Sequence, residues 1–268
     1  MPARAARRLA DKVYVYDMMD APWTGVGRAG LAQKVVRADR ERGRYLGLIG
    51  FEPMTRTGLH QHLGTAISYF LDGSLHDYGG VTVQGQAGIN LGGATHDAIA
   101  YNRCVLVSRL EGPVIYPPEE GADGGEGPHG LHAGARHVPT LVNPAPERPP
   151  EIVATVEALP IEGTALAGVT RRLIFDYART DTNRRFVQLC LLPGTALPAH
   201  VVTDLTEWFV LGGDVAVNGV RAGGGSFVVL EPGTKAEVST QYGTRLLAWA
   251  EGPVRWLSGR PSPDLYAF

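Results

Sequence analysis

Two histidines separated by one residue are the first feature of this sequence that could do chemistry. They are His60 and His62, in the stretch GLHQHLGTAISYFLDG. Residues i and i+2 of a β-strand point to the same face, so the two imidazoles would project together. Inside a small barrel they would need partners for their ring nitrogens, and a divalent metal supplies them. His96, in LGGATHDAIAYN, is the third candidate metal ligand, expected on a neighbouring strand.

The composition predicts that an all-β scaffold positions these histidines. The chain has 35 glycines and 19 prolines among 268 residues, with 44% apolar residues, which is typical of many short strands joined by tight turns. Runs such as RYLGLIGFEP, TAISYFLDG and RCVLVSRLEGPV read as strands, and no long helix is expected. Short antiparallel strands without helices to cover them close into a sandwich or barrel.

An internal repeat at an offset of 140 residues indicates a duplication. EGPV occurs at 111–114 and again at 251–254. The same offset superposes His60 on His200 and a series of glycines, prolines and leucines, the residues that set turns and core strands. The sequence therefore predicts two copies of one β domain in tandem.

A segment rich in proline, glycine and acidic residues separates the two copies. We expect an N-terminal domain at residues 1–115, a linker or long loop at 116–150 and a C-terminal domain at 151–268. Three histidines in the linker, His129, His132 and His137, are not expected to form a metal site because preorganised ligands sit on regular elements.

Charge and hydropathy exclude several classes of partner. The net charge of −2 provides no field for binding nucleic acid, and no stretch approaches the roughly 20 apolar residues of a membrane span. The basic amino end, MPARAARRL, lacks the apolar run of a secretory signal, so a cytoplasmic protein is expected. Cys104 and Cys190 lie in apolar runs and are expected to be core residues that form no disulfide.

These motifs resemble the double signature of the cupin superfamily, G(x)5HxH(x)3-4E(x)6G followed by G(x)5PxG(x)2H(x)3N. The first half retains His60, His62 and His96 together with the glycines at 73, 85 and 93. The second half retains Gly194, His200, Glu207 and Gly213. The resemblance covers most of residues 45–115 and 185–255, and it implies two jelly-roll barrels, each with a ligand site inside.

Departures from the signature distinguish the two halves. Ile67 occupies the position of the usual glutamate ligand in the first half, which leaves three histidines and no carboxylate. In the second half Val202 and Ala236 replace the second and third histidines. The second barrel is therefore expected to have a degenerate metal site, with His200 and Glu207 as a candidate buried pair.

Within the cupins, the sequence is most similar to the ChrR-like group. That group includes the cupin domain of ChrR-type anti-sigma factors and the dioxygenases that cleave acetylacetone and 2,4'-dihydroxyacetophenone. The resemblance implies Fe(II) on three histidines, with zinc, nickel or manganese as alternatives. It also implies chelation of a dicarbonyl or hydroxyketone-like substrate, with O2-dependent cleavage of a C–C bond.

Two other functions stay open at this point. One is a metal-binding sensor without turnover, although residues 1–44 contain no histidine or cysteine and are too short for the sigma-binding domain of an anti-sigma factor. The other is an isomerase or lyase that uses the same metal as a Lewis acid without O2.

Three further residues are candidates for a catalytic role near the metal. Tyr69 shares the strand parity of Ile67, His76 follows a predicted hairpin, and Asn102 lies six residues beyond His96. Apolar residues near the histidines predict a mainly apolar pocket, namely Ile67, Phe70, Leu71, Ala98 and Ala100. The resemblance to the cupins, which commonly pair through their edge strands, implies a homo-oligomer such as a dimer.

Overall fold

The computed structural model of the chain describes residues 6–77, 80–116, 151–177, 184–258 and 265–268. Within these ranges the chain is almost entirely β-structure, as the composition predicts, with one short 3-10 helix, η1 (Val156–Ala158). No helix among the described residues is long and apolar enough to cross a membrane. Both cysteines are free thiols; Cys104 is buried, as expected of a core residue, whereas Cys190 is only partly buried.

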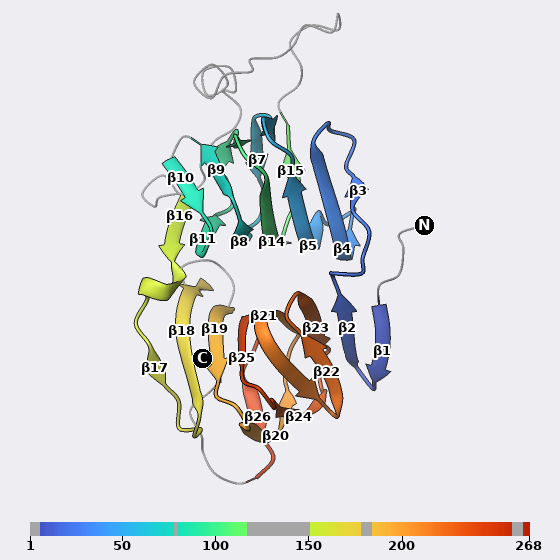
Figure 1. Cartoon of the computed structure of the whole chain (residues 1–268), viewed down its shortest axis with the longest axis vertical. Coiled ribbons are helices and arrows are strands. Elements are labelled where there is room, and N and C mark those ends of the chain that lie inside the picture. Colours follow the sequence, from blue (N-terminus) through green and yellow to red (C-terminus); the bar gives the residue numbers. More distant parts are fainter. Residues whose placement is uncertain (1–5, 78–79, 117–150, 178–183, 259–264) are drawn as a thin grey trace, which may run out of the picture. The chain divides into compact units, whose positions relative to one another are not determined.

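The chain forms two compact units. The N-terminal unit is Trp23–Thr155, and the C-terminal unit combines Met1–Pro22 with Val156–Phe268. Each unit is built from antiparallel strands that curl into a β-sandwich (Figure 1). The linker histidines at 129, 132 and 137 and nearly all of the expected linker lie outside the described residues.

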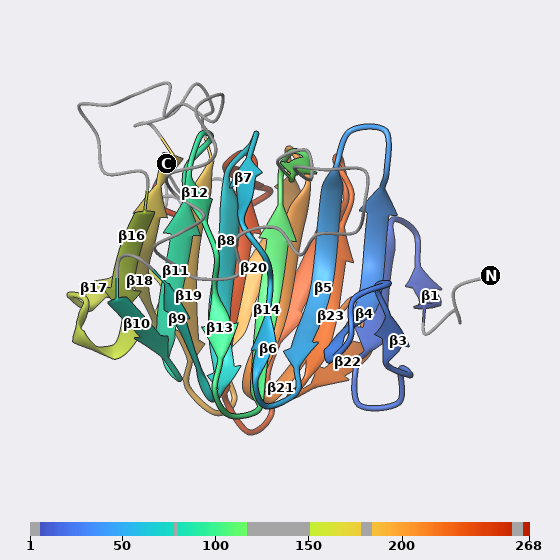
Figure 2. The same ribbon diagram turned by 90° about the horizontal axis from the view of Figure 1, so that it is seen from above.

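Three sheets make up the N-terminal unit. The large sheet has the strand order β16–β11–β8–β14–β5–β4–β3, which Figure 2 shows from left to right. Its strands are β3 (Thr24–Gly25), β4 (Leu31–Asp39), β5 (Arg44–Phe51), β8 (Ala66–Asp72), β11 (Gln86–Asn90), β14 (Cys104–Leu110) and β16 (Glu151–Thr155). A second sheet contains β10 (Gly80–Val83), β9 (Ser74–Asp77), β13 (Ile99–Ala100) and β6 (Thr55–Arg56). The third contains β12 (Thr95–His96), β7 (His60–His62) and β15 (Val114–Ile115).

The C-terminal unit has a main strand path of β1–β2–β23–β21–β25–β19–β18–β17. These strands are β1 (Ala6–Ala10), β2 (Val13–Asp17), β17 (Glu162–Gly163), β18 (Val169–Asp176), β19 (Arg185–Leu191), β21 (Thr206–Val217), β23 (Ser226–Leu230) and β25 (Thr244–Ala250). Off this path lie β20 (Ala196–Val202), β22 (Val220–Gly223), β24 (Lys235–Ser239) and β26 (Val254–Trp256).

The two units share one strand register, as the offset of 140 predicts. Adding 140 to both residues of a cross-strand pair in the first unit gives a cross-strand pair in the second. The matching pairs are Leu106–Ile49 with Leu246–Leu189, His60–His96 with His200–Ala236, and Val114–His62 with Val254–Val202. The duplication therefore extends to individual hydrogen-bonded partners.

Each unit also has strands from outside its own half of the sequence: β1 and β2 in the C-terminal unit, and β16 in the N-terminal unit. β2, near the amino end, pairs with β23 of the C-terminal unit, so the blue strands β1 and β2 lie beside orange strands in Figure 1. β16, which begins the second half, pairs with β11 of the N-terminal unit. β11 and β23 are equivalent under the 140-residue offset, so β16 and β2 occupy equivalent edges.

This exchange makes the units differ from the expected domain boundaries at two places. Residues 1–22 belong to the C-terminal unit, and residues 151–155 belong to the N-terminal unit. Strand pairing explains both differences, because an added strand satisfies the backbone groups of a sheet edge wherever it lies in the sequence.

Candidate metal centre

The three sequence-predicted histidines lie together in the N-terminal unit. His60 and His62 are the two ends of β7, and His96 ends β12, whose register places it directly opposite His60. The ring centroids are 4.9 Å apart for His60 and His62, 4.5 Å for His60 and His96, and 5.2 Å for His62 and His96. All three side chains are buried, and one ligand atom from each lies within 4.8 Å of the others.

Hydrogen bonds at Nδ1 fix the tautomers of His60 and His96. His60 Nδ1 lies 2.7 Å from the carbonyl oxygen of Gly58. A carbonyl oxygen only accepts, so Nδ1 carries the proton and the lone pair is on Nε2. His96 Nδ1 lies 3.3 Å from Asp77 Oδ2, and an ionised carboxylate fixes the same tautomer there. Both histidines therefore offer Nε2 as the ligand atom.

Burial keeps these imidazoles neutral. Desolvation, reinforced by the neighbouring His96, lowers the pKa of His60 to about 3. Desolvation also holds the pKa of His62 well below its ordinary value, and the nearby His60 and His96 act in the same direction. At neutral pH these two side chains are unprotonated, which is the form that binds a metal.

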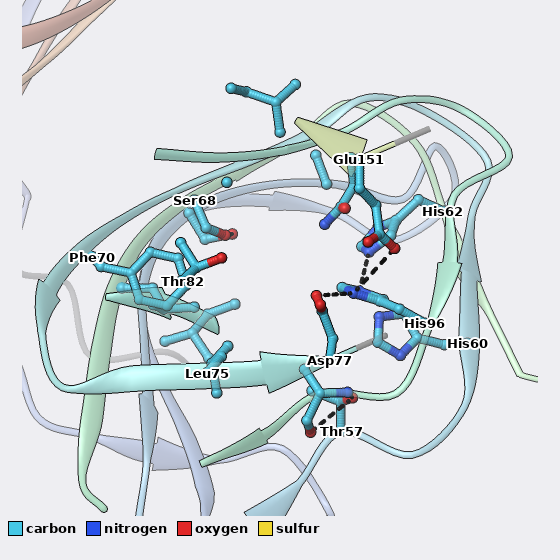
Figure 3. A pocket seen from close by; sticks show the side chains of 18 of the residues that line it. Thr57, His60, His62, Ser68, Phe70, Leu75, Asp77, Thr82, His96 and Glu151 are labelled. Atoms are coloured by element: carbon cyan, nitrogen blue, oxygen red, sulfur yellow. Dashed lines mark hydrogen bonds and ion pairs between the residues drawn. The ribbon is translucent and has the colours of Figure 1, made fainter. Parts of the chain in front are cut away.

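The spacing of the ligand atoms fits a metal ion. His62 Nε2 and His96 Nε2 lie 3.1 Å apart (Figure 3). Two nitrogens at about 2.1 Å from one ion, at angles between tetrahedral and octahedral values, would lie about 3.0–3.4 Å apart. A cation between them also satisfies nitrogens that are buried away from water. His60, His62 and His96 are therefore the residues that would hold a divalent metal.

The histidines line a cavity of about 640 Å³ within the same unit. Most of its wall is apolar, with side chains that include Leu31, Ile49, Phe51, Phe70, Leu75 and Leu106. Polar groups occur in a smaller number, among them the hydroxyls of Ser68, Thr82 and Ser108. No lysine or arginine is among the described residues that line it. The mainly apolar pocket expected from the sequence is thus present.

Two carboxylates that the sequence analysis missed lie beside the histidines. Asp77, on β9, and Glu151, the first residue of β16, both line the cavity. Glu151 Oε1 lies 3.7 Å from His96 Nδ1 (Figure 3). Burial, together with the nearby Asp77, raises the pKa of Glu151, and His96 opposes that shift. Strand alternation could have suggested Asp77, but nothing in the sequence places β16 in this unit.

The three other candidate residues are not brought to the cavity. Tyr69 lies on the face of β8 opposite to the lining residues Ser68 and Phe70. His76 alternates with the lining residue Asp77 on β9, and its ring packs 4.8 Å from that of Tyr101. Asn102 is exposed in the turn before β14. The structure gives none of these residues a place beside the histidines.

The position of the signature's glutamate on β8 also differs by one residue from the prediction. Ala66, rather than Ile67, lines the cavity on β8. Counting alternate residues from His62 gives Ala66, Ser68 and Phe70, which are the lining residues of β8, so the inward glutamate position follows His62 after three intervening residues instead of four. The expectation that β8 provides no carboxylate still holds, because alanine occupies the inward position.

The equivalent positions of the C-terminal unit form a filled core. Trp208 replaces Ser68 and Val228 replaces Gly88, and both belong to the core cluster. His200 Nδ1 bonds to the carbonyl oxygen of Pro198 at 2.9 Å, while its Nε2 has no hydrogen-bond partner among the described residues. The expected His200–Glu207 pair is therefore absent, since Glu207 lies on the face of β21 opposite to Trp208.

Comparisons with known proteins agree with this architecture. Residues 11–114 match the family model of the ChrR cupin-like domain. The first half of the chain thus matches a ChrR-like cupin domain, and both units have the cupin jelly-roll fold. No curated protein matches it in sequence. The jelly-roll fold expected from the motifs is confirmed by solved structures that share the fold at low sequence identity.

Three of these structures cover nearly the whole chain. A protein from Nostoc punctiforme PCC 73102, provisionally described as a dioxygenase, is 10% identical, with a TM-score of 0.68 over 94% of this chain and 86% of its own. A bacterial pirin from Escherichia coli in complex with nickel(II) is 14% identical, with a TM-score of 0.58 over 90% and 99%. Oxalate decarboxylase from Bacillus subtilis is 14% identical, with a TM-score of 0.60 over 91% and 79%. Likeness at this identity establishes the fold.

Proposed function

We propose that the N-terminal cupin is a metal-dependent dioxygenase for neutral carbonyl compounds with an apolar body. The observation that carries the proposal is the position of three buried imidazoles on the wall of a largely apolar cavity. The substrate is a dicarbonyl or a hydroxyketone, which can chelate a metal through two oxygens. Both atoms of O2 enter the products as a C–C bond of the substrate breaks.

The charge of the cavity favours a neutral substrate. Asp77 and Glu151 line it, and no lysine or arginine does so among the described residues. A dicarboxylate such as oxalate would therefore meet two carboxylates and no side-chain cation. Unpaired like charges in a desolvated site are costly, whereas a diketone enters without charge.

Each group of residues has a distinct task in this proposal. The three histidines hold the metal, and the hydroxyls of Ser68 and Ser108, 3.4 Å apart, can bond a substrate oxygen. The apolar wall excludes water from the bound substrate. A metal held there supplies a Lewis acid that acidifies the carbonyl compound and, as Fe(II), the redox chemistry for reaction with O2.

Fe(II) is the metal that we propose, since three neutral ligands leave positions for a chelating substrate and O2. Other metals occur in proteins of this fold. The similar pirin structure contains nickel(II), and Mn(II) centres are described for the similar oxalate decarboxylase. Metal analysis of the purified protein is therefore part of the test.

The test is O2 uptake by protein reconstituted with Fe(II) under anaerobic conditions. We expect one O2 consumed per substrate with members of a panel of β-diketones and hydroxyacetophenones, and none with oxalate. Stoichiometric zinc in the purified protein, with no O2 uptake after iron reconstitution, would contradict the proposal. Product formation without O2 uptake would instead indicate an isomerase or lyase.

A substitution in the cavity separates substrate binding from metal binding. Ser68→Trp places in this barrel the side chain that fills the other one at Trp208. We expect Ser68→Trp to keep its metal and lose at least about 90% of substrate-dependent O2 uptake, because the cavity is closed. Ser68→Ala is the matched control and should retain most of the activity. Full activity in Ser68→Trp would exclude this cavity as the substrate site.

The alternative function is a metal-binding sensor without turnover. It is favoured by the match of residues 11–114 to the ChrR cupin-like domain, because ChrR-type anti-sigma factors contain such a domain. The cavity argues for an enzyme, because a sensor that only binds a metal ion has no need of a space of about 640 Å³ beside the histidines.

A further inference from the structure

Two carboxylates converge on the outer nitrogen of one candidate metal ligand. Asp77 Oδ2 and Glu151 Oε1 lie 3.3 Å and 3.7 Å from His96 Nδ1 (Figure 3). Their side chains are about four-fifths buried, at 20% and 21% exposure. At the same ring position His60 contacts a backbone carbonyl, which any sequence would provide. The Nδ1 of His96, by contrast, faces two acidic side chains that are specific to this sequence.

The C-terminal barrel provides an internal comparison for these acids. Asp77 corresponds to Val217 under the 140-residue offset. Glu151 corresponds to Val13, because Glu151 pairs with Asn90 on β11 just as Val13 pairs with the equivalent Leu230 on β23. Both valines are buried in the apolar core. Carboxylates therefore stand at these two positions only in the barrel that has all three histidines.

Strand register also relates Glu151 to the vacant glutamate position of the cupin signature. Ala66 on β8 pairs with Asn90 on β11, and Asn90 pairs with Glu151 on β16. The three residues form one cross-strand row, and all of them line the cavity. A carboxylate thus reaches the site from the exchanged strand, two strands away from the position at which the cupin signature places it.

We propose that Asp77 and Glu151 are positioning residues of the metal centre. Asp77 accepts the Nδ1 proton of His96, which keeps the Nε2 lone pair directed at the metal position. Glu151, 3.7 Å from the same nitrogen, adds a second acidic side chain that strengthens the imidazole as a ligand. β16 accordingly completes a site whose ligands come from β7 and β12. The inference rests on the metal site of the proposed function, but not on its reaction.

Metal affinity is the first measurement. Co(II) binding is measured by competition with a chromogenic chelator in the wild type, Asp77→Asn, Glu151→Gln and the double variant. Loss of partners of this kind typically weakens binding on the order of 10–100-fold, and we expect that range for the double variant. Glu52→Gln, an exposed acid of the same unit outside the cavity lining, is the matched control and should bind as the wild type.

A spectroscopic readout separates positioning from a structural effect. In the Co(II)-loaded protein, exchangeable Nδ1 protons of ligating histidines give hyperfine-shifted proton resonances. We expect the His96 resonance to be retained in the wild type and lost to fast solvent exchange in the double variant. The His60 resonance should persist in both, because its proton is donated to the Gly58 carbonyl.

The outcomes distinguish this inference from the proposed function. A double variant that binds Co(II) within twofold of the wild type and keeps the His96 resonance would overturn the inference and leave the proposed function intact. A changed Co(II) absorption spectrum in Glu151→Gln alone would overturn it too, because Glu151 would then be a direct ligand. Failure of the wild type to bind Co(II) would overturn both. If the double variant does not fold, the single variants carry the same measurements.

Discussion

His60 and His200 are equivalent buried histidines of the two barrels, but only His60 has other histidines beside it. His60 Nε2 is directed at a position shared with His62 and His96, whereas Val202 and Ala236 stand at the corresponding places around His200. The ring of Trp256 packs 5.1 Å from that of His200. Without other ligands, His200 is a neutral imidazole in an apolar core, and burial lowers its pKa.

The lowered pKa of His200 predicts how stability depends on pH. The folded-state pKa lies below the unfolded value of about 6.5, so the unfolded chain binds the proton first. The stability that neutral His200 provides is fully present above about pH 6.5 and is lost as pH falls toward the folded-state pKa. One such group contributes at most about 1.4 kcal/mol per pH unit.

Chemical denaturation of metal-free protein between pH 7.5 and 5.5 measures this dependence. Trp208, Trp249 and Trp256 lie in the C-terminal unit and Trp23 in the N-terminal unit, so tryptophan fluorescence in a Trp23→Phe background reports unfolding of the C-terminal unit. His200→Gln should lose less stability than the wild type on acidification, by roughly 1 kcal/mol. Equal losses in the two proteins would mean that His200 is not buried in the neutral form.

Among individual residues, the sequence predicts the candidate metal ligands better than it predicts the side chains that surround them. The HxH spacing and the cupin signature identify His60, His62 and His96, because strand parity is reliable within β7. Tyr69 was predicted from the parity of Ile67, but the inward residues of β8 are Ala66, Ser68 and Phe70, which share the parity of His62. Glu151 could not be found, since it reaches the site only through the pairing of β16 with β11.

Strand exchange is the main feature at the scale of elements. β2 covers the β23 edge with a ladder from Val13 to Asp17, and its inward residues Val13 and Val15 belong to the core of the C-terminal unit. The amino-terminal strand is therefore part of a core built mostly from residues more than 150 positions away.

A charged residue on β2 should destabilise the C-terminal unit alone. Val15→Asp buries an unpaired carboxylate in that core, which costs several kcal/mol. We expect the Tm of the tryptophan fluorescence transition to fall by roughly 10 °C. Metal affinity should stay within twofold of the wild type, because the histidines belong to the other unit.

Met19→Asp is the control for this substitution, since Met19 is 75% exposed. Its Tm should match that of the wild type. If Val15→Asp left the fluorescence transition unchanged, or abolished metal binding, β2 would not belong to the core of the C-terminal unit.

Local sequence patterns predict the strands themselves but not which sheet β2 and β16 join. Alternating apolar residues and glycine turns mark each strand, and the 140-residue repeat pairs equivalent strands. The choice of edge for β2 and β16 depends on which backbone groups remain unpaired in the folded sheets, and that information is not local.

For the molecule as a whole, duplication has produced one hollow barrel and one filled barrel. Glycine, serine and the carboxylates of the first cavity correspond to valine, tryptophan and alanine side chains in the second core. Tyr266 adds to this filling, because its hydroxyl accepts a hydrogen bond from Trp208 Nε1 at 3.1 Å. The two barrels therefore differ, with the candidate metal site in one and a filled core in the other.

Metal stoichiometry tests this difference most directly. The measurement is elemental analysis of protein loaded with one divalent metal, for the wild type, His96→Ala and His200→Ala. We expect one ion per chain in the wild type and in His200→Ala. In His96→Ala we expect affinity roughly a hundredfold weaker or worse, because a direct ligand is lost. Two ions per wild-type chain, or full occupancy in His96→Ala, would contradict this expectation.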